Sequence, residues 1–257
     1  MNLNTFLFRL FSYSIYYYRA QSNLYIHSPF IFNWINELNA VRTVVNKQIN
    51  LYRDKLEGNL DFIGFSNLGK EKKTTVRNRY RQTSIKDSYG KILQATASYI
   101  HASSFVELGT SLGVSTSYII SAQPYIQGTT LDSNLQTSTI AAILSNEIFS
   151  SRKVQYANGL FQDLLPEIIK KMKRLDFVFI DGDHSSDGTL ENLELLRPSL
   201  SDNAAVVLDD IRWNRDMYKA WTIGASLPEF NYAVDFGRMG ILFKVNNHSP
   251  KQYFTIL

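Results

Sequence analysis

Apolar residues in the second half of the chain follow two alternating spacings. Short and nearly continuous apolar runs predict buried strands, and apolar residues three or four positions apart predict amphipathic helices between them. This alternation indicates a mostly parallel sheet covered on both faces. The expected strands are 104–108, 128–131, 153–156, 175–180, 204–208, 231–236 and 240–245. The expected helices between them are 114–122, 137–149, 164–172, 188–196 and 214–223.

The last two expected strands are joined by a short turn at 237–239 instead of a helix. Strands connected in this way are expected to be antiparallel. The pattern therefore predicts an α/β fold with a seven-stranded, mostly parallel sheet that contains one antiparallel strand.

The first 87 residues have a different pattern. Residues 3–20 predict an aromatic-rich helix, and Ser28-Pro29 predicts the start of another, which continues through residue 58. We expect a helical N-terminal extension over 1–87 and a main domain over 88–257. The first helix is expected to pack on the main domain or on a second copy, which makes a homodimer through the N-terminal helices an open expectation.

The extension also contains a basic segment, 70–87. Lys70–Lys91 has eight Lys or Arg residues and two acidic ones, a net charge of +6, so the remaining chain is at −2 within a total of +4. We favour a solvated loop, with a flap over an anionic substrate as the alternative. Few aromatic residues are interleaved with these charges, so nucleic acid is not an expected partner.

Composition excludes some classes of site. The 257 residues include no cysteine, so disulfides and thiolate metal sites are excluded. Neither an apolar span of about 20 residues nor the features of a signal peptide are found. A cytoplasmic protein without a transmembrane segment is therefore expected.

A glycine turn follows the first expected strand, in the sequence S-F-V-E-L-G-T-S-L-G-V-S-T at 104–116. A strand, a turn at Gly109 and a helix starting near Gly113 direct backbone N–H groups toward one point, as nucleotide-binding sites do. The spacing E-x-G-x-x-x-G lacks the second glycine of the dinucleotide fingerprint G-x-G-x-x-G, which disfavours an NAD(P)-dependent oxidoreductase. A plain tight turn is the alternative.

Acidic residues follow the expected strands, where open α/β sheets bind their ligands. Asp132 comes 23 residues after Gly109, close to the separation of about 20 expected of a ribose-binding acid. Asp181, Asp209 and Asp210 could bind Mg²⁺ through carboxylate oxygens, with His184 as general base. Without a metal, His184 alone would be the base, and Asp209 or Asp210 would orient it or cap a helix.

These segments resemble known families. The glycine turn resembles motif I of the class I S-adenosylmethionine (SAM)-dependent methyltransferases. The F-I-D-G-D-H and L-D-D-I segments, at 179–184 and 208–211, resemble a bacterial O-methyltransferase-like family. The H-S-P-F segment at 27–30 and the K-Q-Y-F-T segment at 251–255 resemble its Bacteroidetes-type subgroup.

A more distant similarity is to the catechol O-methyltransferases. Asp181 and His184 match a metal-binding Asp and, three residues later, a catalytic Lys, and Asp209-Asp210 matches an Asp-Asn metal pair. Residues 159–163 resemble the adenine-contacting loop of that family. Two departures, His for Lys and Asp for Asn, affect proton transfer and the charge around a metal. Asp132 also stands where a Glu is more usual.

The resemblance implies a Rossmann-like class I methyltransferase that methylates a hydroxyl of a small molecule with SAM, with Mg²⁺ assistance left open. A non-catalytic SAM- or nucleotide-binding module is the alternative outside the enzymes. The expected cofactor-binding residues are Glu107, Gly109, Thr110, Ser111, Gly113, Asp132, Ser133, Phe161, Gln162 and Asp181. The expected catalytic residues are His184 and Asp181, and the metal ligands Asp181, Asp209 and Asp210.

Overall fold

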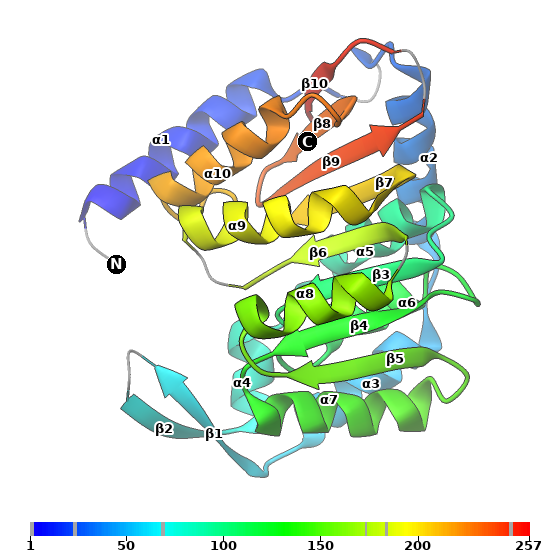
Figure 1. Ribbon diagram of the computed structural model, residues 1–257. Coiled ribbons are helices and arrows are strands. Elements are labelled where there is room, and N and C mark those ends of the chain that lie inside the picture. Colours follow the sequence, from blue (N-terminus) through cyan, green and yellow to red (C-terminus); the bar gives the residue numbers. More distant parts are fainter. Residues whose placement is uncertain (1–2, 23–24, 68–69, 173, 183–184, 247–248) are drawn as a thin grey trace. The chain divides into compact units, whose positions relative to one another are not determined.

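A computed structural model describes residues 3–22, 25–67, 70–172, 174–182, 185–246 and 249–257 (Figure 1). The chain forms two compact units. We call Glu37–Leu164 the central unit, and Met1–Asn36 with Leu165–Leu257 the terminal unit. The boundary expected at residue 87 lies inside the central unit and stays a prediction.

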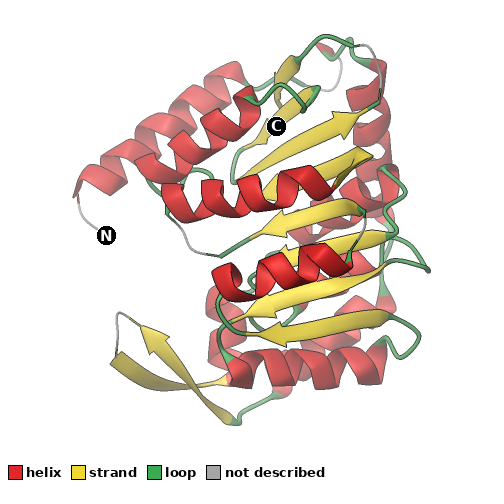
Figure 2. Ribbon diagram, in the orientation of Figure 1, coloured by secondary structure: helices red, strands yellow, loops and turns green. Residues whose placement is uncertain are grey.

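Strands and helices alternate along most of the chain (Figure 2). The central unit contains α3 (Lys47–Gly58), β1 (Phe62–Asn67), β2 (Lys70–Thr75), α4 (Val76–Thr83), α5 (Asp87–Tyr99), β3 (Ser104–Leu108), α6 (Val114–Ile120), β4 (Gln127–Asp132), α7 (Leu135–Ile148) and β5 (Lys153–Asn158). The terminal unit contains α1 (Leu3–Arg19), β6 (Leu175–Ile180), α9 (Ser186–Leu196), β7 (Leu200–Leu208), α10 (Arg215–Ser226), β8 (Tyr232–Phe236), β9 (Met239–Val245) and β10 (Gln252–Thr255). Helices α2 (Pro29–Thr43) and α8 (Phe161–Lys171) cross the boundaries between the units.

Three parallel strands form the sheet of the central unit. β4 pairs with β3 on one side and with β5 on the other, so that Val106 lies beside Thr129 and Thr130 beside Tyr156. Phe105 and Val106 are fully buried, as expected for a strand covered on both faces. Because the three strands are parallel, their carboxyl ends, with the loops that follow, lie at one edge.

The terminal unit has the strand order β10-β8-β9-β7-β6. β6 is parallel to β7, whereas β9 is antiparallel to both β7 and β8. The expectation of a single antiparallel strand is therefore confirmed, and so is the antiparallel pairing of the last two predicted strands. Within this unit, α9 and α10 pack against each other.

The described strands β3 to β10 number eight, so the expected seven was wrong by one. The additional strand is β10, which pairs in parallel with β8. Its sequence, Gln-Tyr-Phe-Thr, lacks the regular alternation of buried and exposed apolar side chains from which a strand is predicted.

Residues 40–83 also differ from expectation. The helix predicted to continue to residue 58 is interrupted after Thr43, and α3 begins after Asn46, whose Oδ1 accepts hydrogen bonds from the N–H groups of Gln48 and Ile49. The basic segment forms strand β2, antiparallel to β1, and helix α4. The favoured solvated loop is therefore wrong for this stretch.

Helix α1 packs on the rest of the terminal unit, as favoured from the sequence. The ring of Phe8 contacts that of Tyr218, with centroids 6.1 Å apart, and the Arg9 guanidinium lies 4.1 Å from the ring centroid of Trp213. Tyr16 donates its hydroxyl proton to the carbonyl of Ile256. Within the described ranges, no helix has both the length and the apolarity needed to cross a membrane.

Candidate functional site

The glycine turn after β3 has the backbone geometry that its spacing predicts. Gly109, Ser111 and Gly113 all have positive φ angles, of 105°, 45° and 72°. The N–H groups of Gly109 and Thr110 both donate to the carbonyl of Leu131 in β4, at 2.8 and 3.1 Å. The turn is therefore fixed against the carboxyl end of the neighbouring strand.

Position 113 accepts only glycine without rearrangement. A Cβ there would lie 2.5 Å from Tyr52 Oη and 2.8 Å from the Cβ of Ala141. Tyr52 is itself fixed, because its hydroxyl donates to the carbonyl of Leu112 at 2.9 Å. The second glycine of the motif thus brings the turn close to α3 and α7.

Glu107 is fully buried beneath the turn. Its Oε2 accepts a hydrogen bond from the hydroxyl of Thr116 and another, at 2.7 Å, from the hydroxyl of Thr130. Thr130 Oγ1 in turn lies 2.6 Å from Thr110 Oγ1. Burial raises the pKa of Glu107 to about 7, with hydroxyl hydrogen bonds opposing the shift and Asp132 adding to it. Glu107 therefore connects the turn to β4 and α6.

The second carboxylate oxygen of Glu107 indicates which chemical groups a ligand at this turn could offer. Oε1 is buried and has no hydrogen-bond partner within the described chain. A buried acceptor without a donor is costly, and a ligand that supplies one would remove that cost. An ammonium or hydroxyl group, both present in SAM, has the required chemistry.

Asp132 points toward the glycine turn, as predicted. Its Oδ2 accepts from the backbone N–H of Ser111 at 2.6 Å, and its Oδ1 accepts from the N–H of Asn134 at 2.8 Å. Each carboxylate oxygen can accept a second hydrogen bond. The half-buried Asp132 can therefore still bind ribose hydroxyls.

The remaining predicted cofactor residues of this unit lie in loops next to Asp132. Ser133 follows it directly and is exposed, while Phe161 is half-buried and Gln162 exposed at the start of α8. The loop before α8 is attached to β4, because Asn158 Nδ2 and the Gly159 N–H both donate to the carbonyl of Asp132, at 2.8 and 3.1 Å. The predicted adenine loop therefore begins beside the predicted ribose ligand.

Sequence reasoning missed the contribution of α4 to this region. Thr83 Oγ1 lies 3.3 Å from Ser111 Oγ. Burial lowers the pKa of Arg79, and the negative charge of Asp132 opposes that shift. The basic composition of this segment is visible in the sequence. The contact of Thr83 with Ser111, 28 residues later, depends on the tertiary fold.

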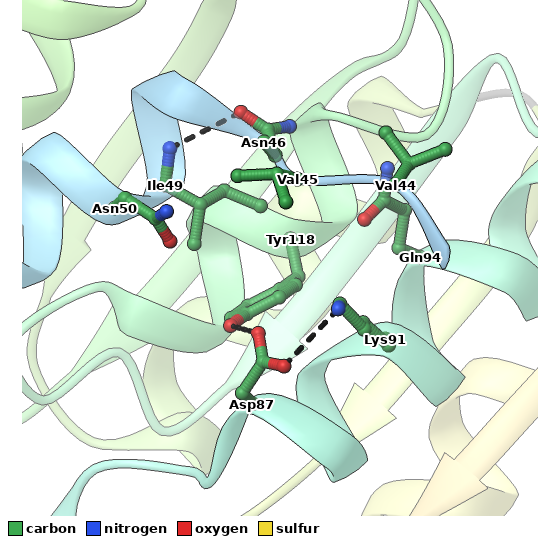
Figure 3. A pocket seen from close by; sticks show the side chains of 9 residues that line it. All are labelled: Val44, Val45, Asn46, Ile49, Asn50, Asp87, Lys91, Gln94 and Tyr118. Carbon is green, nitrogen blue, oxygen red and sulfur yellow. Dashed lines mark hydrogen bonds and ion pairs between the residues drawn. The ribbon is translucent and has the colours of Figure 1, made fainter. Parts of the chain in front are cut away.

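A pocket of about 210 Å³ also lies within the central unit (Figure 3). Among its lining residues, Asp87 accepts a hydrogen bond from Tyr118 Oη at 2.6 Å and forms an ion pair with Lys91 at 3.2 Å. It includes none of the predicted site residues and contributes nothing to their assignment.

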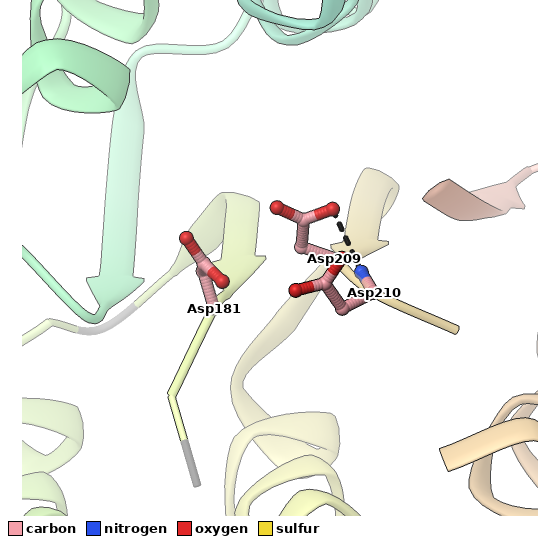
Figure 4. Close-up of side chains that lie close together, drawn as sticks. All are labelled: Asp181, Asp209 and Asp210. Carbon is pink, nitrogen blue, oxygen red and sulfur yellow. Dashed lines mark hydrogen bonds between the residues drawn. The ribbon is translucent and has the colours of Figure 1, made fainter. Parts of the chain in front are cut away.

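The terminal unit contains the predicted acidic cluster, formed by Asp181, Asp209 and Asp210 (Figure 4). Asp181 follows β6 and the other two follow β7, and one carboxylate oxygen of each lies within 4.8 Å of the others. The strand ends are joined, since the Asp209 N–H donates to the carbonyl of Ile180 at 3.0 Å. His184 lies outside the described residues, so its expected role stays a prediction.

Arg238, from the turn between β8 and β9, pairs with this acidic cluster. Its Nε and Nη2 donate to the two oxygens of Asp209 at 2.8 and 2.6 Å, and Nε is 3.0 Å from Asp210 Oδ1. Burial raises the pKa of Asp209 against the opposing effect of Arg238. Burial lowers the pKa of Arg238, but the carboxylates outweigh it and the net shift is upward.

Arg238 was absent from the predicted site, although the sequence contained a signal for it. The turn at 237–239 was predicted to join two antiparallel strands, and Gly240 in the second of them pairs with Leu208 of β7. Because β9 is antiparallel to β7, a residue just before β9 lies at the carboxyl end of β7. Residue 238 therefore lies beside Asp209 once the hairpin pairs with β7.

The acidic cluster does not fit a divalent metal while Arg238 is in place. Arg238 donates to both oxygens of Asp209 and its Nε lies 3.0 Å from Asp210 Oδ1, so a divalent ion would have to displace the guanidinium from the ligand atoms of both residues. Asp209 Oδ1 also accepts the backbone N–H of Asp210, at 2.7 Å. Three of the roughly four acceptor positions of the Asp209 carboxylate are therefore in use.

Comparison with known proteins places these features in context. Residues 106–211 match a family model described as "Methyltransferase domain". No curated protein matches the sequence.

Solved structures with a similar fold are numerous. An O-methyltransferase from Bacillus cereus in complex with S-adenosylhomocysteine (SAH) has a TM-score of 0.62 and 15% identity, covering 82% of this chain and 96% of that one. TomG from Streptomyces achromogenes, an O-methyltransferase involved in tomaymycin synthesis and solved with SAM, has a TM-score of 0.59 and 15% identity, covering 84% and 98%. The SAH-bound methyltransferase PaMTH1 from Podospora anserina has a TM-score of 0.59 and 13% identity, covering 84% and 97%.

The structural likeness at this level of identity concerns the fold, and it confirms the predicted Rossmann-like methyltransferase architecture. The family match covers the glycine turn, Asp132 and the acidic cluster. The chain therefore combines the fold of the O-methyltransferases with a segment that matches a methyltransferase-domain family in sequence.

Proposed function

We propose that this chain is a SAM-dependent methyltransferase that transfers the methyl group to a hydroxyl of a small molecule. The observation that carries the proposal is the match of residues 106–211 to the methyltransferase-domain model, which includes the glycine turn and the Asp132 that points toward it. The unsatisfied Glu107 Oε1 supports a ligand with a hydrogen-bond donor at the same turn.

Six of the predicted cofactor residues then have a defined task. Gly109 and Gly113 allow the turn its positive φ angles, and Glu107 fixes the turn and offers Oε1 to the ammonium group. Asp132 accepts from the ribose hydroxyls, and Phe161 and Gln162 contact the adenine. When bound, SAM would supply an electrophilic methyl group on its sulfonium sulfur. The oxygen of the acceptor would form a bond to the methyl carbon as the carbon–sulfur bond breaks and SAH leaves.

The acceptor hydroxyl must lose a proton, and we assign its removal to His184. Asp181 would position the acceptor, whereas Asp209 and Asp210 already bind Arg238. The His184→Ala variant should lose turnover by at least a hundredfold, because a general base contributes 10²–10⁴-fold, while its affinity for SAM stays unchanged. An unchanged rate across a panel of phenols, sugars and lipids would remove His184 from the mechanism.

Calorimetric titration with SAM, SAH and NADH tests the cofactor assignment. Wild type should bind SAM and SAH but not NADH, and Asp132→Asn should weaken SAM binding about tenfold or more, because a charged hydrogen bond to a ligand contributes about 1.5–3 kcal/mol. The matched control is Asp54→Asn, an exposed Asp on α3 of the same unit, which should bind as wild type. No binding at millimolar SAM would contradict the proposal, and binding without turnover on any acceptor would favour a non-catalytic module.

We also propose that two copies of the chain form a homodimer through α1. Leu7, Leu10 and Phe11 are 51%, 58% and 67% exposed on this helix, an apolar face that a second copy would cover. Sedimentation velocity should show a dimer for wild type and a monomer for Leu10→Glu. A wild-type monomer at high micromolar concentration would contradict this arrangement.

A further inference from the structure

Arg238 is the cation of the acidic cluster in this structure. Its guanidinium binds both oxygens of Asp209 and lies 3.0 Å from Asp210 Oδ1. The same two carboxylates, with Asp181, are the residues whose oxygens converge within 4.8 Å as metal ligands would. The guanidinium therefore uses the donor atoms that a metal in this cluster would need.

The turn that carries Arg238 is fixed by its own contacts. Arg212, buried at 3% exposure, forms a two-point ion pair with Asp235 at 2.7 and 2.6 Å and donates to the carbonyl of Gly237 at 2.6 Å. The carbonyl of Arg238 accepts the Ile211 N–H at 2.9 Å, one residue after Asp210. The backbone at Arg238 is thus tied on both sides to the segment that contains the two aspartates.

A guanidinium and a divalent ion make competing demands on these carboxylates. Arg binds a carboxylate in a planar two-point arrangement, whereas Mg²⁺ and Mn²⁺ require oxygens in near-octahedral positions. The protein supplies the planar arrangement, with Asp209 fully buried against Arg238. A long cationic side chain on a fixed turn cannot leave the cluster without exposing a buried carboxylate.

We propose that Arg238 takes the place of a divalent metal in the acidic cluster, so that the protein's own guanidinium partly compensates the charge of Asp209 and Asp210 and the cluster binds no metal ion. It follows that the three carboxylates become a divalent-cation site when that guanidinium is removed. This inference concerns the charges of the terminal unit and does not rest on methyl transfer.

Titration with MnCl₂, followed by the electron paramagnetic resonance signal of free Mn²⁺ and by calorimetry, tests it. Wild type should leave Mn²⁺ free up to millimolar concentration. Arg238→Met, which removes the charge and keeps an unbranched apolar stem, should bind one Mn²⁺ per chain at least tenfold more tightly than wild type. Adding Asp209→Asn to Arg238→Met should return binding to the wild-type level.

Two variants act as controls. Arg215→Met removes the same charge from an exposed position on α10 of the same unit, and it should behave as wild type. Arg238→Lys keeps a positive charge in the acidic cluster and should also leave Mn²⁺ free. Circular dichroism and thermal unfolding establish that each variant is folded.

Every result decides the question. One Mn²⁺ bound by wild type, lost in Asp209→Asn, would overturn the inference, and so would a folded Arg238→Met variant that binds no Mn²⁺. If Arg238→Met does not fold, the wild-type titration decides alone. Failure to bind SAM would remove the proposed function without changing the Mn²⁺ result, and Mn²⁺ binding by wild type would leave the methyltransferase assignment standing.

Discussion

Gly113 and Glu107 set the geometry of the glycine turn, each for a different reason. Gly113 has a φ of 72° and no room for a Cβ. Glu107 is a buried carboxylate with one oxygen bound by hydroxyls and the other without a partner in the described chain. Gly113 therefore restricts which residues the turn can contain, and the burial of the Glu107 carboxylate destabilises its charged form. Each effect leads to a separate prediction.

Replacing Gly113 with alanine should destabilise the protein by about 2–4 kcal/mol. A positive φ costs an alanine about 1–2 kcal/mol, and its Cβ would be forced to within 2.5 Å of Tyr52 Oη. Urea unfolding measures the change. Gly58→Ala is the control, because nothing lies within 4 Å of a Cβ at position 58, and it should be neutral or slightly stabilising. Equal effects of the two substitutions would contradict the described turn.

Glu107 predicts a dependence of stability on pH. Its pKa is about 7 in the folded protein against an ordinary value of 4.5, so the folded state binds more protons between these pH values. Stability from this group is therefore fully present below about pH 4.5 and is lost as pH rises through about 7, a total of about 3 kcal/mol. Urea unfolding across this range should show a loss that is smaller in Glu107→Gln than in wild type by about 3 kcal/mol, since only the contribution of Glu107 is removed.

The control for this pH series is Glu147→Gln. The Glu147 side chain is 52% exposed and pairs with Lys55 at the surface, so its removal should leave the pH dependence as in wild type. A Glu107→Gln variant whose stability changes with pH as much as that of wild type would show that Glu107 is not the group responsible.

At the scale of elements, the β8–β9 hairpin fixes the segment after β7. Arg212 and Asp235 are buried at 3% and 2% exposure and form a two-point ion pair. Removing one partner of a buried pair leaves the other charge without compensation, which costs about 3–5 kcal/mol. Asp235→Asn should therefore lower the free energy of unfolding by about that amount.

Thermal and urea unfolding measure this loss, and Asp202→Asn serves as the control. Asp202 is an exposed residue in β7 of the same unit, so its substitution should change stability by less than about 0.5 kcal/mol. A near-neutral Asp235→Asn variant would mean that the hairpin is not fixed by this pair.

Strands with buried apolar side chains could be predicted from the sequence. Strands that form mainly through backbone pairing with a neighbouring strand could not. Strands such as β3 and β6 are nearly continuous apolar runs, and burial confirms them. β2 has the sequence Lys-Glu-Lys-Lys-Thr-Thr, which offers no apolar pattern, and it forms a strand because β1 pairs with its backbone. β10 likewise exists through its pairing with β8.

The predicted site shows the same division. Glycine spacing and an acid after β4 were enough to predict that Asp132 points toward the turn, because both features are local to strand ends. Thr83 lies in a helix distant in sequence, and no local pattern connects it with the turn. The hairpin turn that carries Arg238 was predicted, but it lies beside the acidic cluster only because β9 pairs with β7. Partners of predicted residues therefore require the tertiary structure.

At the scale of the whole molecule, the proposed tasks divide between the two units. The central unit contains the glycine turn, Asp132 and the start of α8, to which we assign the binding of SAM. The terminal unit contains the acidic cluster with Arg238, and α1 packs on it. Cofactor binding is therefore expected to stabilise the central unit directly.

Hydrogen–deuterium exchange with and without SAH measures where the cofactor binds. The account predicts slower exchange in peptides covering 104–116 and 127–136, because the turn and the segment around Asp132 would close on the ligand. Exchange that stays unchanged in both peptides at saturating SAH, or SAH that does not bind at all, would contradict a SAM site at the glycine turn.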